Sequence, residues 1–284
     1  MISMIRITGK NLLDAVAQDV KSFFPGRSQF ELKIEYSGNN PTCRGVGSNC
    51  RIRIPSVFKD CEINDPAELN FWLFVLGHEI AHYLNRHNDF NACTEESTLE
   101  SRALEDWADF FGAKLMMTLI TYGEQVAQFY RGFPENKGSA RFAYISEAFA
   151  KLANTFYVSS SSRYSPRLVR IGSGVAGIMS FIDRDIGDVN VWRSVSIMQQ
   201  IYRSPSLNDI VMAENMEFPE SIEPIVQIHQ NIQGLAPAIT EGLAPFLMQF
   251  IGTSYNGSKE ERHQYVETMR QEALRQGLEV PSSS

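Results

Sequence analysis

The sequence has no hydrophobic run long enough to cross a membrane, no excess of basic residues and no CxxC pair of cysteines. Its most apolar runs, 71–76 and 171–182, fall short of the roughly 20 residues that a membrane-spanning helix needs. The first residues also lack the basic, apolar and small-residue segments of an export signal. We therefore expect a soluble cytoplasmic protein without a membrane partner.

Charge and cysteine content exclude further classes. The 284 residues carry 26 Lys and Arg against 33 Asp and Glu, a net charge of −7. An acidic chain without a dense basic segment binds phosphate backbones poorly, so no nucleic-acid partner is expected. The four cysteines lack the spacing of zinc ribbons and thioredoxins. A reducing compartment favours free thiols, with a Cys43–Cys50 bridge as the alternative.

Hydrophobic periodicity gives the expected elements. A helix is predicted over 9–24, then strands over 30–36 and 51–54 with a loop over 38–49 between them. Pro55 ends the second strand and suits an edge position, because proline cannot donate to a ladder. Loops are predicted over 88–98, 132–138 and 159–162. Further helices are predicted over 65–87, 99–122, 140–157, 166–182, 190–203, 206–215, 221–232, 237–251 and 258–276.

This order of elements predicts the fold class. One helix, a few strands and then many helices indicate an α+β protein with a small mixed sheet. The 43% of hydrophobic residues can form a sizeable core. A serine-rich segment at 159–162 is a candidate boundary between residues 1–160 and a mostly helical region, 161–284, that packs on them.

One motif carries chemistry. Residues 78–82, in the helix predicted from Asp65, read His-Glu-Ile-Ala-His, an HExxH pattern. His78 and His82 lie one helical turn apart on one face, so both imidazoles can bind a single zinc ion. Glu79 can lie beside a zinc-bound water and act as the general base. Catalytic zinc takes three protein ligands and keeps one open position, so a third ligand must exist.

The third ligand is expected from the next helix. Asn85 and Asn88 stand where metzincins have glycine and histidine, which excludes that family. Glu105 and Asp109 lie one turn apart on one face of the helix predicted over 99–122. We predict that Glu105 binds zinc and that Asp109 accepts a hydrogen bond from the second nitrogen of a ligand histidine.

Other carboxylates compete with Glu105. Asp106 points about 100° away from it on the helix and is expected to be solvated or to cap. Glu95 and Glu96 fall in or near the predicted connection, where solvated charges are expected. Glu100 is expected to pair with Arg102 or with solvent. None of the four is predicted to bind the metal.

Three histidines lie outside the motif. His87 comes five residues after His82, off the ligand face, and is expected to interact with the dipole at the helix end. A substrate-binding or ligand-supporting role for His87 is the alternative. His229 and His263 lie on late predicted helices without neighbouring ligand residues, and ordinary surface or core roles are expected for both.

The segments 74–84 (FVLGHEIAHYL) and 105–112 (EDWADFFG) together resemble the HExxH…ExxAD pattern of gluzincin metallopeptidases. The pattern is similar to the HtpX/CaaX-protease group, which usually has membrane helices or an export signal, and to the ImmA/IrrE regulators. The longer strings most resemble the Lit-like phage-exclusion peptidases. This resemblance covers about residues 50–125.

The resemblance implies a zincin-like catalytic domain in residues 1–160 and a zinc endopeptidase that cleaves an intracellular protein. In the Lit-like family the substrate is elongation factor Tu. The alternatives are an ImmA/IrrE-like protease acting on a repressor and a zincin-shaped binding module without turnover. An extended substrate would pair with the strand at 51–54, taken as the edge of the sheet.

A later segment could complete the site. Residues 164–170 read Tyr-Ser-Pro-Arg-Leu-Val-Arg and open a predicted helix. Zincins commonly supply a Tyr, His or Arg from a later segment to stabilise the oxyanion, and Tyr164 or Arg170 could do so. The favoured alternative has Ser165 as the N-cap, Pro166 in the first turn and the arginines in solvent.

Overall fold

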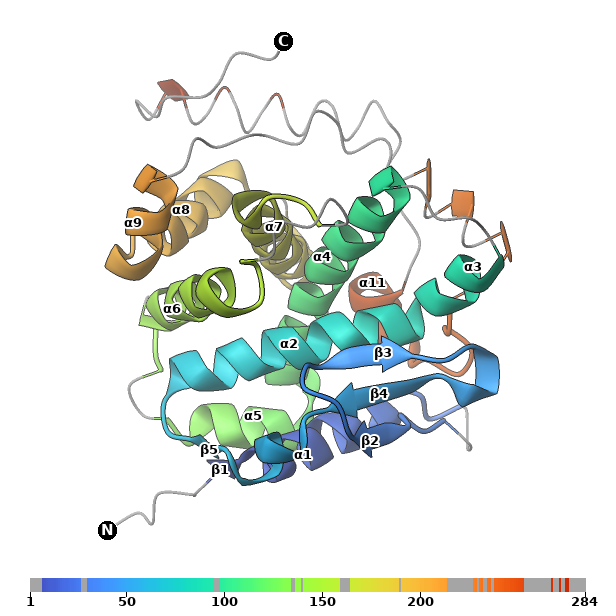
Figure 1. Cartoon of the computed structure of the whole chain (residues 1–284). Coiled ribbons are helices and arrows are strands. Elements are labelled where there is room, and N and C mark those ends of the chain that lie inside the picture. Colours follow the sequence, from blue (N-terminus) through green and yellow to red (C-terminus); the bar gives the residue numbers. More distant parts are fainter. Residues whose placement is uncertain are drawn as a thin grey trace.

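The computed structural model describes residues 7–26, 30–93, 98–133, 136–138, 140–158, 164–188, 190–213 and 238–252, with single residues between 227 and 235 and between 267 and 275. In that part of the chain, helices predominate and the strands form small sheets (Figure 1). The predicted α+β class with a small sheet is therefore confirmed.

Two small sheets lie in the first quarter of the chain. β1 (Ile7–Thr8) pairs antiparallel with β5 (Glu62–Ile63). The second sheet has the order β2-β4-β3, in which β2 runs parallel and β3 antiparallel to β4. Its strands and the neighbouring 3₁₀ turns are β2 (Ile34–Tyr36), β3 (Thr42–Arg44), η1 (Gly47–Asn49), β4 (Arg51–Ile54) and η2 (Ser56–Asp60).

The sheet corrects two predictions. Residues 38–49 are not all loop, because 42–44 form β3. A strand of three residues, in a segment rich in Gly, Asn and Pro, is too short to show the alternation of apolar and polar residues by which strands are predicted. The strand at 51–54 is the central strand, with β2 on one side and β3 on the other. Pro55 follows the last paired residue, so it limits the length of β4 without making it an edge.

The helices follow the predicted order with local differences. Their bounds are α1 (Gly9–Ser22), α2 (Pro66–Leu84), α3 (His87–Cys93), α4 (Thr98–Tyr122), α5 (Glu124–Arg131), α6 (Ala140–Thr155), α7 (Arg167–Ile186), α8 (Val191–Tyr202), α9 (Pro205–Ala213), η3 (Pro245–Leu247) and α11 (Met248–Ile251). α5 was not predicted, and α3 occupies much of the predicted connection 88–98. Of the helix predicted over 237–251, residues 238–244 are not helical. Those predicted over 221–232 and 258–276 lie largely outside the described residues.

The motif helix α2 begins as its sequence predicts and ends earlier. The Asp65 side chain accepts a hydrogen bond from the Glu68 N–H (2.8 Å), and Pro66 occupies the first turn. At the other end Asn85 is the C-cap, and Arg86 adopts a left-handed φ of +54°. A residue in that conformation cannot continue a right-handed helix, so the chain turns and α3 starts at His87.

α2 runs through the middle of the molecule (Figure 1). It packs against α4 and α6 and also contacts β3 and β4. A Cβ on Gly77 would lie 2.5 Å from the Gly112 carbonyl oxygen, and one on Gly112 would lie 2.6 Å from the His78 nitrogen. Only glycine permits this contact between the backbones of α2 and α4. The crossing brings His78 close to the α4 carboxylates.

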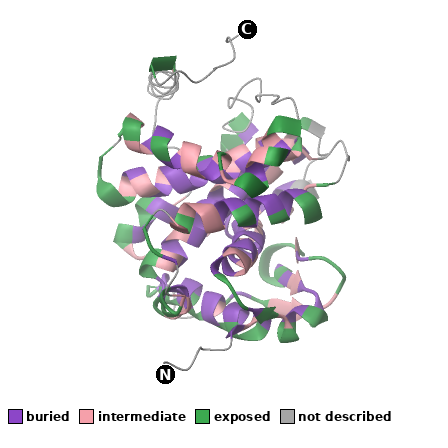
Figure 2. Ribbon diagram, turned by 90° about the vertical axis from the view of Figure 1, so that its left-hand side faces the viewer, coloured by how far each residue is buried: buried purple, intermediate pink, exposed green. Residues whose placement is uncertain are grey.

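One hydrophobic core joins most of the elements. It takes buried side chains from α1, the sheet, α2, α4, α6, α7, α8, α9 and α11, so both predicted domains contribute to it. Figure 2 shows the buried residues on the helices at the centre and the exposed ones on outward faces. The predicted boundary segment itself, 159–162, lies outside the described residues.

Candidate metal centre

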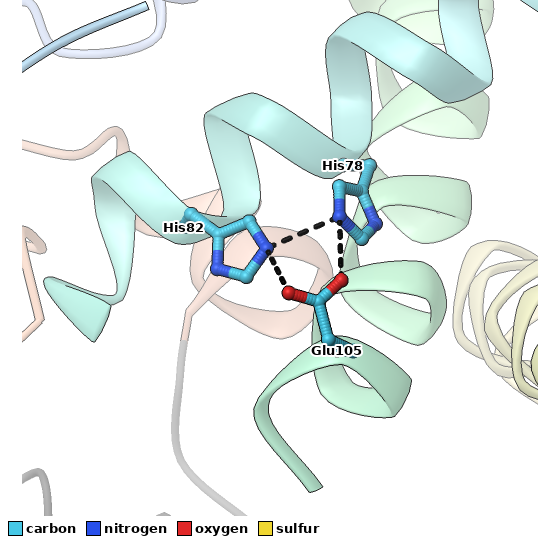
Figure 3. Close-up of side chains that lie close together, drawn as sticks. All are labelled: His78, His82 and Glu105. Atoms are coloured by element: carbon cyan, nitrogen blue, oxygen red, sulfur yellow. Dashed lines mark hydrogen bonds and ion pairs between the residues drawn. The ribbon is translucent and has the colours of Figure 1, made fainter. Parts of the chain in front are cut away.

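α2 and α4 bring three ligand side chains together (Figure 3). His78 Nε2 lies 3.1 Å from His82 Nε2 and 3.3 Å from Glu105 Oε2, and His82 Nε2 lies 3.7 Å from Glu105 Oε1. Among the described residues, these three form the one group of His, Cys, Asp and Glu side chains that could hold a metal ion. Glu100 is not part of it, and Glu95 and Glu96 lie outside the described residues.

The spacing of these atoms fits a tetrahedral ion. Zinc–nitrogen and zinc–oxygen bonds of about 2.0–2.2 Å place neighbouring tetrahedral ligands about 3.3–3.6 Å apart. The three observed distances, 3.1–3.7 Å, lie near that range, with the two to Glu105 measured to different oxygens of its carboxylate. Two imidazole nitrogens and one carboxylate are also a common donor set for a site that keeps an open position. His78, His82 and Glu105 can therefore hold a metal ion.

Asp109 anchors the first histidine. Its Oδ1 accepts a hydrogen bond from His78 Nδ1 at 2.8 Å, the contact that the sequence spacing predicts. The buried carboxylate also accepts from the Tyr157 hydroxyl at 3.0 Å, from Arg170 Nε at 2.7 Å and from Arg170 Nη2 at 3.1 Å. These bonds fix the orientation of Asp109, and Asp109 in turn fixes the His78 ring.

Arg170 enters the site from α7. Its side chain is only 6% exposed, with Nη2 3.6 Å from Glu105 Oε2. The guanidinium carbon lies 4.0 Å from the centroid of the Tyr157 ring and 5.2 Å from that of Tyr164. The expectation of a solvated arginine is therefore wrong for Arg170, because it is buried against the carboxylates of Asp109 and Glu105. An oxyanion-stabilising role for Arg170 or Tyr164 stays a prediction.

Ser165 and Asp106 also differ from expectation. The residue that caps α7 is Pro166, without a side-chain hydrogen bond, whereas the Ser165 hydroxyl donates to Asp106 Oδ2 at 2.8 Å. Asp106 is buried, and this burial raises its pKa to about 7. Asp106 is therefore neither solvated nor a cap, and its bond to Ser165 ties α4 to the start of α7.

His87 holds the second histidine. Its Nδ1 lies 2.7 Å from His82 Nδ1, and its side chain is buried. The expected position off the ligand face assumed a continuous helix, but the left-handed turn at Arg86 starts a new helix that folds His87 back onto His82. His87 therefore contacts a candidate ligand, which agrees with the alternative left open by the sequence.

Burial, neighbouring charges and hydrogen bonds determine the protonation of the cluster in the absence of a metal ion. Burial opposes charge on His78, but Asp109 and Glu105 outweigh it and raise its pKa to about 10. Burial lowers the pKa of His82 to about 4, so this ring is neutral. The Nε2 proton of His78 faces both Glu105 Oε2 and His82 Nε2, and when His82 Nε2 accepts it, the proton of His82 lies on Nδ1, directed to His87.

The two carboxylates are ionised. Burial would raise the pKa of Glu105, but its hydrogen bond with His78 and the charges around it lower that pKa to about 2. Arg170 and His78 likewise overcome the burial of Asp109 and lower its pKa to about 2. Two cations and two anions thus balance at the centre of the site.

Glu79 lies on the face of α2 towards β3. Its carboxylate is buried and accepts a hydrogen bond from the backbone N–H of Cys43. Burial raises the pKa of Glu79 to about 7, despite the opposing charge of His78. A carboxylate with a pKa near neutrality, beside a possible metal site, is suited to proton transfer.

Sequence reasoning missed several partners. Tyr157 and Arg170 reach Asp109 only because α6 and α7 pack against α2 and α4. Tyr157, at the end of a predicted helix, carried no local signal. Asn88 was considered only as a missing ligand, yet its amide faces two thiols. His87 had a detectable signal, its position directly after the motif.

Comparison with models of protein families, with curated proteins and with solved structures finds no match to this chain. None of the described helices is long and apolar enough to cross a membrane. The geometry of the α2–α4 site thus carries the functional inference.

Glu105→Ala is expected to weaken zinc affinity by more than about 100-fold, the upper end for groups that only support a ligand. Asp109→Asn should weaken it by about 10–100-fold, because the ligand histidine loses its anionic partner. Glu100→Ala, on the same helix but outside the cluster, is the control and should bind as wild type does. Competition with a chelating dye measures the zinc affinity of all three variants. If Glu105→Ala bound zinc as tightly as wild type, Glu105 would not be a ligand.

His87→Phe is expected to weaken zinc affinity by about 10–100-fold, because the His82 Nδ1–H loses its acceptor. His87→Gln offers an amide oxygen to the same N–H and should recover part of the loss. Circular dichroism checks that both variants fold. Equal zinc affinity of His87→Phe and wild type would show that the contact does not orient the ligand.

Proposed function

We propose that this protein is a zinc-dependent endopeptidase. The observation that carries the proposal is the convergence of His78, His82 and Glu105 at tetrahedral ligand spacing. Glu79, on the same helix, supplies a buried carboxylate with a pKa of about 7. This combination of three ligands and an adjacent base is what zinc-dependent hydrolysis of an amide requires.

Zinc bound by these residues would polarise the peptide carbonyl and make water a better nucleophile at neutral pH. Glu79 accepts a proton from the attacking water and passes it to the leaving amine nitrogen. Its burial keeps the proton affinity high enough for both transfers, and the Cys43 N–H fixes the carboxylate in place. His87 and Asp109 keep the ligand rings oriented during the reaction.

The substrate is proposed to lie along β3. The Ile52 N–H donates to the Lys33 carbonyl, so the Cys43–Ile52 pair of the antiparallel ladder is not a hydrogen-bonded one. The N–H and C=O of Cys43 therefore point away from β4, towards the outer edge of the sheet. Because the Cys43 N–H already donates to Glu79, the Cys43 C=O is the group with which an extended peptide would pair at that edge, and this moves the proposed docking strand from β4 to β3.

The resemblance of 74–84 and 105–112 to Lit-like phage-exclusion peptidases supports a protein substrate, with elongation factor Tu as the first candidate. An ImmA/IrrE-like protease would cleave a repressor instead. A zincin-shaped binding module would hold zinc and cleave nothing. These alternatives predict different products, so one experiment separates them.

The test compares newly formed protein N-termini, by mass spectrometry, in a bacterial lysate treated with zinc-loaded protein, chelator-treated protein or zinc-loaded Glu79→Gln. Cleavage is expected only with the zinc-loaded wild type and should return when zinc is restored to the chelated protein. Purified elongation factor Tu is then tested directly. Zinc binding at about one ion per chain without any new N-terminus would favour the binding module.

A further inference from the structure

A pair of thiols lies beside the base, outside the proposed metal site. Cys43 is in β3 and Cys50 directly precedes β4, and their Sγ atoms are 3.4 Å apart. Asn88 Nδ2, from α3, faces both sulfurs at 3.5 Å and 4.0 Å. The proposed hydrolysis makes no use of either thiol.

We propose that Cys43 and Cys50 are a redox-active dithiol that forms a reversible disulfide by exchange with a small disulfide such as oxidised glutathione, and that this bond lowers the activity of the adjacent site. The first half of this inference concerns the two thiols alone. The second half rests on the proposed peptidase function.

The geometry favours disulfide exchange at Cys43 and Cys50 and not at Cys61. The sulfurs of the pair must approach by only about 1.4 Å to reach the disulfide length of about 2.05 Å. Cys43 is half-buried, so a small disulfide can reach it, whereas Cys50 is buried. Donation from the Cys43 thiol and from Asn88 lowers the pKa of Cys50, while the same contact raises the pKa of Cys43. Cys50 is therefore the thiol that ionises more easily, and transfer of the Cys43 proton to it across the 3.4 Å contact gives the Cys43 thiolate.

The exchange balances in two steps. The Cys43 thiolate attacks one sulfur of glutathione disulfide, forms a mixed disulfide and expels glutathione thiolate, which takes up a proton. The Cys50 thiol then loses its proton to solvent and attacks the Cys43 sulfur, expelling the second glutathione. Two protein thiols are oxidised, and one glutathione disulfide is reduced to two thiols.

The pair is connected to the site on two sides. The backbone N–H of Cys43 holds the Glu79 carboxylate, so a shift of β3 moves the base. Asn88 is adjacent to His87, which holds His82, so losing the thiol contacts alters the start of α3. Since a displacement of about 1 Å in an active site can cost 10²-fold in rate, we expect the oxidised form to be at least tenfold slower.

The bond itself is tested on full-length, zinc-loaded protein equilibrated with glutathione buffers of varied ratio, then alkylated and digested without reduction. A peptide linked through Cys43 and Cys50 should form and revert with the ratio. It should vanish in Cys43→Ser and in Cys50→Ser and persist in the control Cys61→Ser. Absence of the linked peptide, or glutathione retained on Cys43, would overturn the dithiol proposal whether or not the protein is a peptidase.

The coupling is tested by amide hydrogen exchange at 42–44 and 87–90, which needs no activity. Exchange in both segments should differ between the oxidised and reduced protein, and identical exchange would overturn the coupling. The cleavage rate of an active wild type should fall on oxidation and recover on reduction, whereas Cys50→Ser should not respond. Protein that forms the bond but never cleaves would contradict the peptidase function and leave the dithiol standing.

Discussion

Glu79→Gln is expected to lower kcat by about 10²–10⁴-fold, the range for a positioned acid–base group. Glutamine has almost the same shape, and its amide oxygen can still accept the Cys43 N–H, so neither the fold nor the zinc content should change. The amide cannot take up a proton from water or deliver one to the leaving nitrogen. The loss should therefore fall on kcat and not on zinc affinity.

Single-turnover cleavage of the substrate found in the lysate, with metal analysis of each sample, measures both quantities. Glu100→Gln makes the same chemical change on α4, outside the ligand group, and should keep wild-type kcat. If Glu79→Gln cleaved at the wild-type rate with zinc bound, another group would have to be the base.

Arg170→Ala is expected to destabilise the metal-free protein by about 3–5 kcal/mol, the cost of removing one partner of a buried ion pair. Arg170 makes two hydrogen bonds to Asp109, whose side chain is 1% exposed, and also faces Glu105. Without it, the buried Asp109 and the partly buried Glu105 share only the charge of His78. The free energy of unfolding falls because a carboxylate without its partner is solvated less well in the folded protein than in the unfolded chain.

Urea unfolding of chelator-treated protein measures this loss. Arg203→Ala, at the exposed end of α8, is the control and should stay within about 0.5 kcal/mol of wild type. Arg170→Met combined with Asp109→Asn removes both charges of the pair and should be more stable than Arg170→Ala alone. An unchanged midpoint for Arg170→Ala would show that the pair contributes nothing to folding.

The candidate ligands could be predicted from the sequence because, in a regular helix, the spacing of two residues determines whether they share a face. His78 and His82, and Glu105 and Asp109, are each one turn apart, so one face of each helix carries the pair. That these two faces meet depends on the Gly77–Gly112 contact, which requires knowing how α2 and α4 cross. Spacing along a helix was therefore predictable, and the crossing that brings the two helices together was not.

The supporting residues depend on less regular features. His87 reaches His82 through a single left-handed residue, Arg86, which no periodicity signals. Tyr157 and Arg170 depend on how distant helices pack. The edge strand β3 has only three residues, in a segment whose composition indicates a loop, so the central position of β4 could not be predicted either.

The proton on His78 has a consequence for how the protein would bind a metal ion. It occupies Nε2, the same atom that would bind zinc, between Glu105 and His82. Metal uptake must therefore release about one proton, and affinity should rise about tenfold per pH unit through the neutral range. Without a metal ion, the charges of the His78 imidazolium and the Arg170 guanidinium together offset those of Asp109 and Glu105. Unlike a zinc finger, which is unfolded without its ion, a site with balanced charges would allow this chain to fold first and to exchange a proton for a metal ion afterwards.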